Sequence, residues 1–153
     1  MLKTIINFLK QLFFPQKRNQ AKTPKNHDLK DYRPKKLLTQ TEIKFFDALK
    51  IATNENYILL PQINLASIIE RVDEHKYQNE LYRNIDFAIF DKFYNPIVLI
   101  EINDRTHKDK KRIARDIKVK EICNNANISL ITFWTEYGIN QEYINKRIAE
   151  YTK

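Results

Sequence analysis

The chain has 153 residues and a formal net charge of +8, and this length predicts a single domain. Its one cysteine, Cys123, excludes an internal disulfide and a cysteine-based zinc site, and it fits a reducing compartment such as the bacterial cytoplasm. Its one glycine, Gly138, excludes a glycine-rich phosphate loop and a nucleophile elbow. The three histidines are too far apart in the sequence for a zincin motif. The chemistry that remains belongs to carboxylates, amides and basic side chains.

Residues 1–14 are predicted to form an amphipathic helix. Their apolar side chains recur at helical spacing, at Leu2, Ile5, Ile6, Leu9, Leu12 and Phe13. The segment is too short and too polar to span a bilayer. It could anchor the chain in the plane of a membrane, or it could dock on its own domain or on a partner.

Residues 15–36 are predicted to be a basic linker, since they hold three of the five prolines. Residues 1–36 contain ten lysines and arginines against two acids, whereas residues 37–153 contain 17 of each. The basicity therefore belongs to an N-terminal arm, and residues 37–153 are the expected folded domain. Such an arm binds nucleic acid or the anionic inner face of a membrane, or it is a solvated tail.

The domain is predicted to begin with a helix that runs to about Ala52, because Thr39 and Glu42 form a capping-box signature. The next segment is an expected strand in which Pro61 favours a sheet edge or a bulge. From there the pattern predicts, in chain order, strand 57–65, loop 73–83, a hairpin of strands 84–90 and 96–103, helix 108–126, strand 128–134 and helix 140–152. This αβββαβα order predicts an α/β fold with a mixed central sheet flanked by helices.

Two carboxylates are predicted to meet in the hairpin. Side chains alternate along a strand, so Glu101 and Asn103 share one face. If Phe90 pairs with Ile97, then Asp86 lies opposite Glu101. Like charges placed opposite each other destabilise a sheet, which predicts a neutralising Mg²⁺ or Mn²⁺ held by carboxylates, water and phosphate. Alternatively, one acid pairs with a nearby lysine or arginine or lies at the solvent edge.

The helix after the hairpin is predicted to bring cations to the same place. Lys108, Arg112 and Arg115 fall on one side of this helix. That side continues with the expected core residues Val119, Ile122 and Ala126. The cations should therefore point toward the sheet end that carries Glu101 and Asn103. They could hold a scissile phosphate, or they could pair with the nearby acids and only neutralise them.

These residues resemble a known superfamily. The stretch IDFAIF at 85–90, then EIND at 101–104 followed by TH, and ARD at 114–116 are similar to the PD-(D/E)XK restriction-endonuclease-like superfamily. The similarity is to its branch that contains the very-short-patch-repair endonucleases. Within that branch, residues 37–135 resemble the bacterial domain-of-unknown-function family 2726.

The resemblance implies a restriction-endonuclease-like three-layer core and a set of site residues. Asp86 and Glu101 would match the two metal-binding acids. Glu42 would match a helix glutamate that completes such sites, or it only closes the capping box. His107 would match the histidine that follows the acidic strand, or it caps the next helix. Arg115 and Asp116 would match the helix motif.

The sequence departs from the superfamily at Asn103, where the motif lysine is expected. An asparagine can bind a metal through its carbonyl oxygen but cannot act as a base. Either Lys108 or His107 supplies the missing function, or catalysis is weak or absent. Further along, Phe133 and Trp134 are core and edge aromatics, or they stack a base.

The leading hypothesis is a metal-dependent nuclease, a hydrolase that cleaves phosphodiester bonds of nucleic acid, with DNA as the expected partner. Its metal, Mg²⁺ or Mn²⁺, would be held by Asp86, Glu101 and Asn103. The predicted catalytic residues are Asp86, Glu101, Asn103, His107 and Glu42. The predicted phosphate contacts are Lys108, Arg112 and Arg115. Two alternatives remain: a catalytically impaired nuclease-fold module that binds nucleic acid, and a membrane-surface protein anchored by residues 1–36.

Overall fold

The computed structural model describes residues 32–72, 79–104 and 110–152. Residues 36–153 form one compact unit, and residues 32–35 before it have no regular structure. The helices and strands of this unit are α2 (Gln40–Ala52), β1 (Ile58–Asn64), β2 (Asn84–Phe90), β3 (Pro96–Asn103), α3 (Lys110–Asn125), β4 (Ser129–Trp134) and α4 (Gln141–Ala149). Short 3-10 turns are η2 (Leu65–Ser67), η3 (Asn79–Leu81) and η4 (Thr135–Tyr137). The helix predicted over 1–14 lies outside the described residues.

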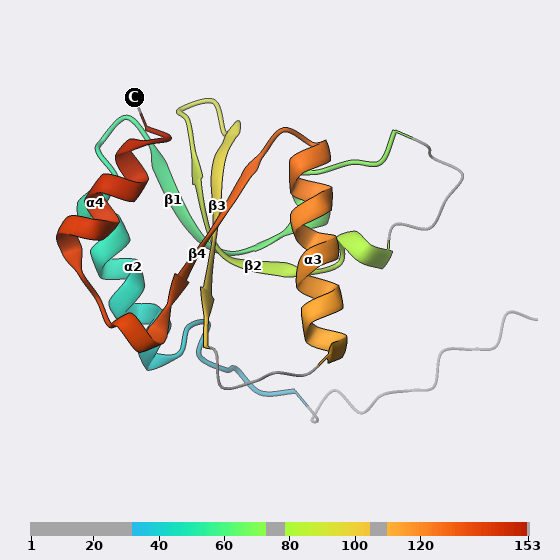
Figure 1. Cartoon of the computed structure of the whole chain (residues 1–153), viewed down its shortest axis with the longest axis horizontal. Helices are drawn as coiled ribbons and strands as arrows, with labels where there is room; N and C mark the ends of the chain where they lie inside the picture. The colour runs from blue at the N-terminus through green and yellow to red at the C-terminus, as the bar shows by residue number, and fades with distance from the viewer. Residues whose placement is uncertain (1–31, 73–78, 105–109, 153) are drawn as a thin grey trace, which may run out of the picture. The chain divides into compact units, whose positions relative to one another are not determined.

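The four strands form one mixed sheet in the order β1-β2-β3-β4. The pairs β1–β2 and β2–β3 are antiparallel, whereas β3 and β4 are parallel because α3 connects them. Figure 1 shows α2 and α4 on one face of the sheet and α3 on the other. The predicted element order and the mixed sheet flanked by helices are confirmed. Within the described ranges, no helix has both the length and the apolar character needed to cross a membrane.

Each face of the sheet carries its own hydrophobic core. Toward α2 and α4, the buried residues include Leu49, Phe87 and Ile148. Toward α3, they include Leu99 and Cys123. Both cores share the central strands β2 and β3, which is why these two strands read as nearly continuous apolar runs in the sequence.

The hairpin register was predicted correctly in its middle and wrongly at its turn. Phe87 pairs with Ile100, and continuing this register places Asp86 opposite Glu101. Phe90, however, pairs with Pro96 rather than with Ile97, because a bulge shifts the register after Ile89. The bulge accommodates the start of β3, where proline has no N–H to contribute to a regular ladder.

The edge strand β1 is irregular where Pro61 predicted it to be. The β1–β2 pairing passes over the next residue, Gln62. Gln62 has a φ of 53°, in the left-handed region that side chains other than glycine rarely adopt. Its amide Nε2 donates a hydrogen bond of 3.1 Å to Glu42 Oε1. The irregular residue therefore ties the sheet edge to α2.

Candidate functional site

A cleft of about 580 Å³ lies between the sheet and the first half of α3. Its polar lining consists of Arg83, Asn84, Glu101, Asn103, Arg115, Asp116, Lys120 and Thr132. Its apolar lining consists of Ile85, Ile113, Ile117, Val119, Leu130 and Trp134. The cleft thus combines carboxylates, amides and cations over an apolar floor, which is the composition of a ligand site rather than of a core.

The cleft exists because the first half of α3 is not packed on the sheet. Residues 113–118 are all exposed, and Val119 is the first buried residue of the helix in the described range. Ile113 and Ile117 remain 48% and 54% exposed although they are apolar and line the cleft. In its described part, α3 contributes to the core from Val119 onward. This agrees with the prediction that Val119, Ile122 and Ala126 face the core.

The sheet wall of the cleft is the end of β3 and its parallel neighbour β4. Glu101 and Asn103 both line the cleft and are half-buried, as alternation along the strand predicted. Across the β3–β4 ladder, Glu101 pairs with Thr132 and Asn103 with Trp134. The two predicted metal-binding side chains of β3 are therefore held where β3 pairs with β4.

Asp86 is fixed against β3 by its own side chain. Its Oδ2 accepts a hydrogen bond of 2.7 Å from the backbone N–H of Ile102. Ile102 lies between Glu101 and Asn103, so the carboxylate of Asp86 reaches the strand at the point where the other two predicted ligands begin. Asp86 is not among the residues that line the cleft. The structure brings it to β3 but not into the open cavity.

Arg115 is the one predicted phosphate contact whose side chain the structure describes. It lines the cleft together with Glu101 and Asn103. It also lies 3.7 Å from the carboxylate of its neighbour Asp116, with about half of each side chain exposed. An exposed pair of this kind contributes little to stability. A ligand phosphate could therefore compete for Arg115 at small cost.

Three predicted site residues lie wholly or partly outside the part of the chain that the structure describes. His107 and Lys108 lie outside the described residues, and so does the side chain of Arg112. In the part of the chain that the structure describes, no three His, Cys, Asp or Glu side chains form a metal-binding group. The predicted metal ligands Asp86, Glu101 and Asn103 are two acids and one amide, so they are not a group of three His, Cys, Asp or Glu side chains.

Glu42 is engaged in local structure on the side of α2. Its Oε2 accepts the Thr39 N–H at 2.6 Å, and its own N–H donates to Thr39 Oγ1 at 3.2 Å. The predicted capping box is therefore present. With Oε1 bonded to Gln62, both carboxylate oxygens have partners. This arrangement supports the capping interpretation of Glu42. Glu42 is also not among the residues that line the cleft.

Removal of either capping side chain is expected to weaken α2 by a similar amount. Thr39→Ala and Glu42→Ala should each lower the free energy of unfolding by about 1 kcal/mol, because each leaves a helix N-terminal N–H without its partner. Urea denaturation followed by circular dichroism measures the change. If Glu42→Ala abolished an activity that Thr39→Ala preserved, the capping role alone would not explain this residue.

Glu101 also acts on a buried neighbour. Cys123 of α3 is fully buried. Its burial, together with the negative charge of Glu101, raises the pKa of the Cys123 thiol to about 11. Cys123 is therefore a neutral thiol at physiological pH and belongs to the core.

Lys120, Arg83 and Asn84 were missed by the sequence predictions. Lys120 lies one turn after Asp116, so a helical wheel drawn from Asp116 would have placed it on the cleft side. Asn84 is the first residue of β2, and Arg83 directly precedes it. An antiparallel hairpin brings the start of its first strand beside the end of its second, so the topology alone could have added them.

Comparisons with known proteins give a family but no activity. Residues 34–150 match the family described as "Protein of unknown function (DUF2726)". The chain is also similar to an uncharacterized protein of Haemophilus influenzae, with 24% identity over 127 residues that cover 80% of this chain and 67% of the relative. No solved structure matches the chain.

Proposed function

The chain belongs to the DUF2726 family, whose description states no function, and we propose from its cleft that it is a metal-dependent nuclease of the PD-(D/E)XK kind. Two features support this proposal. The element order is helix, three strands, helix, strand and helix. The observed pairing of Phe87 with Ile100 also leaves the acids Asp86 and Glu101 as the next residues of β2 and β3, where continuation of the register would place them opposite each other.

The observation that carries the proposal is the pairing of opposite chemistries across one cleft. Glu101 and Asn103 of β3 face the same cavity as Arg115 and Lys120 of α3. The oxygen groups of the cleft suit a divalent cation, and its guanidinium and ammonium groups suit a phosphate. The two kinds of group are interspersed, since Asp116 lies on α3 and Arg83 lies directly before β2. A phosphodiester bound in the cleft would contact both kinds of group.

The donor set fits Mg²⁺ or Mn²⁺. Asp86 and Glu101 offer carboxylate oxygens and Asn103 offers an amide oxygen, which are the ligands that hard cations prefer. The hydrogen bond from Ile102 N–H to Asp86 holds that carboxylate beside β3. When bound, the metal polarises the phosphate and lowers the pKa of its bound water.

The remaining residues of the cleft bind and orient. Arg115 and Lys120 hold the phosphate and offset its charge, which increases during hydrolysis. The strand β3 lacks a cation because Asn103 stands where the motif lysine is expected. Lys120 supplies a cation from α3 instead. Asn103 can orient a water but cannot remove its proton. Residues 1–36, with ten basic residues, would add non-specific affinity that falls with salt.

A second candidate function is a nucleic-acid-binding module without catalysis. Asn103 favours this candidate. With Asn103 in place of lysine, the strand has no basic group next to the metal ligands. Such a module would bind DNA equally well with and without a chelator and would hydrolyse nothing. The dependence of binding and cleavage on metal separates the two candidates.

The proposed function predicts metal-dependent cleavage by the full chain. Single-stranded, duplex and flap-containing DNA and matched RNA should be incubated with Mg²⁺ or Mn²⁺ and with EDTA as the control. We expect cleavage of at least one DNA substrate with metal and none with EDTA. Glu101→Gln should remove the activity, since it replaces a charged ligand by a neutral one of the same shape. Cleavage that persisted in EDTA would contradict the proposal.

A further inference from the structure

A second groove, here called the aromatic groove, adjoins the cleft where β4 ends. Its volume is about 350 Å³. The aromatic side chains that line it are Phe133, Trp134, Tyr137 and Tyr143. Thr132 and Trp134 of the edge strand β4 line both cavities. The groove includes Phe133 and Ile144 of the core toward α2 and α4, whereas the cleft includes Val119 and Leu130 on the side of α3, so the two cavities adjoin across the edge strand. Four aromatic rings at one edge of a site need an explanation beyond core packing.

Only one of these rings belongs to the core. Phe133 is 5% exposed, and its ring meets that of Tyr143 edge to face, with centroids 6.0 Å apart. This contact orients Tyr143, which is nevertheless 52% exposed. Tyr137 is 67% exposed on η4. The groove therefore presents two largely exposed rings on a wall that Phe133 anchors.

The backbone between η4 and α4 follows a defined turn. Gly138 follows η4 with a φ of +64°, and no heavy atom lies within 4 Å of the place where its Cβ would stand. Asn140 then caps α4, since its side chain accepts the Tyr143 N–H at 3.0 Å. The glycine turn and the cap fix the path between Tyr137 and Tyr143. The two exposed rings are thus presented by a defined turn and a helix start.

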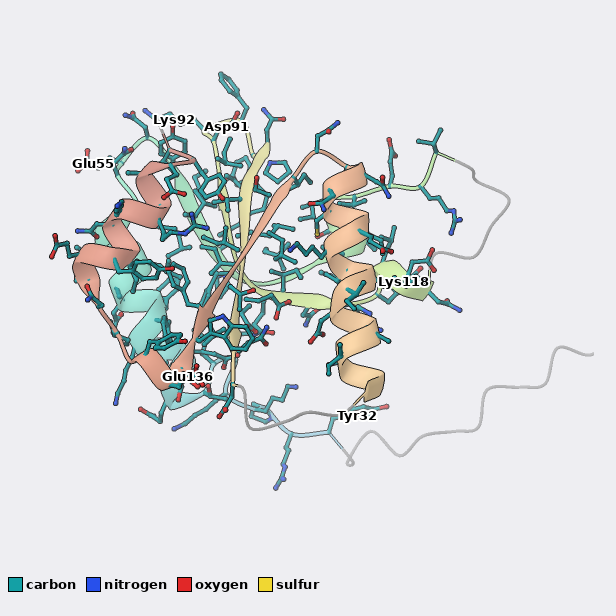
Figure 2. The ribbon with its side chains drawn as sticks, viewed as in Figure 1. Tyr32, Glu55, Asp91, Lys92, Lys118 and Glu136 are labelled. Carbon is teal, nitrogen blue, oxygen red and sulfur yellow. The ribbon has the colours of Figure 1, made fainter. Side chains whose placement is uncertain are left out.

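The charges around the two cavities differ. The cleft is lined by three cations, Arg83, Arg115 and Lys120, as well as by the acids Glu101 and Asp116, and a phosphate would bind to the cations. Beside the aromatic groove the chain carries Glu136 on η4 and Glu142 on the first turn of α4, and Figure 2 shows Glu136 next to the end of β4. Carboxylates there disfavour a phosphate and leave ring stacking as the attraction. This arrangement suits a nucleotide whose phosphate lies in the cleft and whose base lies in the groove.

We infer that the aromatic groove binds an unstacked base of a single-stranded segment next to the phosphate in the cleft. The inference rests on the proposed function, since it takes nucleic acid as the ligand of the site. A base inside a duplex is already stacked on both faces, whereas a base in a single strand offers a free ring face to an aromatic side chain. The preferred substrate class is therefore nucleic acid with a single-stranded segment.

Trp134 makes the inference directly measurable, because it is the only tryptophan of the chain and lines both cavities. The full chain should be titrated in EDTA with an oligothymidylate and with a duplex of equal length, while the tryptophan fluorescence is followed. We expect the single strand to quench Trp134 and to bind more tightly than the duplex. Tyr137→Ala should weaken binding of the single strand about 10-fold, the usual effect of removing one stacked ring.

Two variants control the experiment. Tyr137→Phe keeps the ring and should bind like wild type. Tyr94→Ala removes a ring of similar exposure, 65%, from the β2–β3 turn. Figure 2 places Asp91 of that turn at the other end of the sheet from Glu136, so this variant should also bind like wild type. Unchanged affinity in Tyr137→Ala, or equal binding of the duplex, would overturn the inference.

Failure of the inference about the aromatic groove can be distinguished from failure of the proposed nuclease function. If wild type cleaves DNA with metal but Tyr137→Ala binds oligothymidylate normally, the groove inference fails and the nuclease stands. If Tyr137→Ala weakens quenching in a protein that cleaves nothing, the groove is supported and the catalytic role of the neighbouring cleft is removed.

Discussion

Asp86→Asn is expected to reduce metal-dependent cleavage by about 100-fold or more while leaving the fold unchanged. The carboxylate of Asp86 has two separable roles. It accepts the Ile102 N–H at 2.7 Å, and in the proposed site it supplies a negative ligand. An asparagine amide oxygen can still accept the hydrogen bond, but it is a neutral and weaker ligand. The variant therefore isolates the charge.

Asp86→Ala is the matched comparison. It removes the acceptor as well, so the Ile102 N–H loses its partner at a cost of about 1–3 kcal/mol. Urea denaturation should show this loss for Asp86→Ala and not for Asp86→Asn. Cleavage assays on both variants then separate instability from loss of the ligand. Retention of nearly full cleavage by Asp86→Asn would remove Asp86 from the proposed metal site.

Phe87→Ala is expected to have the largest effect on stability, a loss of about 3–5 kcal/mol. Phe87 is fully buried in the middle of β2 and pairs with Ile100. Its ring packs against that of Phe46 on α2, with centroids 5.9 Å apart. Truncation would open a cavity between the sheet and α2 that neither a rigid central strand nor a capped helix can close.

Chemical denaturation measures this effect, and Phe93→Ala provides the control. Phe93 lies in the β2–β3 turn and is 85% exposed, so its removal should change the free energy of unfolding by less than about 0.5 kcal/mol. Because small domains are stable by only about 5–15 kcal/mol, Phe87→Ala should also lower the midpoint of thermal unfolding clearly. Equal stability of the two variants would contradict the assignment of the core.

The elements of the fold could be predicted wherever local chemistry determines them. The capping box of Thr39 and Glu42 marked the start of α2. The apolar runs at 84–90 and 96–103 coincide with β2 and β3, because central strands are buried on both faces. The predicted hairpin register agrees with the observed pairs from Phe87–Ile100 to Ile89–Val98, although the predicted pairing of Phe90 with Ile97 was wrong. Each of these signals depends on neighbours in the sequence.

The missing features depend on contacts between distant segments. Nothing local shows that Ile113 and Ile117 stay exposed, since apolar residues on a helix ordinarily predict burial. The open first half of α3 is what admits Lys120 to the cleft, and it appears only once the helix is placed on the sheet. The bulge at Phe90 likewise arises from how Pro96 begins β3. Glu101, Asn103 and Arg115 of the cleft could therefore be predicted, whereas its shape and its other polar residues could not.

Titration of Mn²⁺ into the full chain by calorimetry, with and without a non-cleavable oligonucleotide, tests the central claim most directly. It needs no knowledge of the true substrate. Wild type should bind Mn²⁺ saturably, and so should Glu121→Gln, a control that removes an exposed acid of α3 that does not line the cleft. Glu101→Gln should lose this binding. If Glu101→Gln binds Mn²⁺ as wild type does under both conditions, Glu101 is not a metal ligand and the proposed nuclease site is wrong.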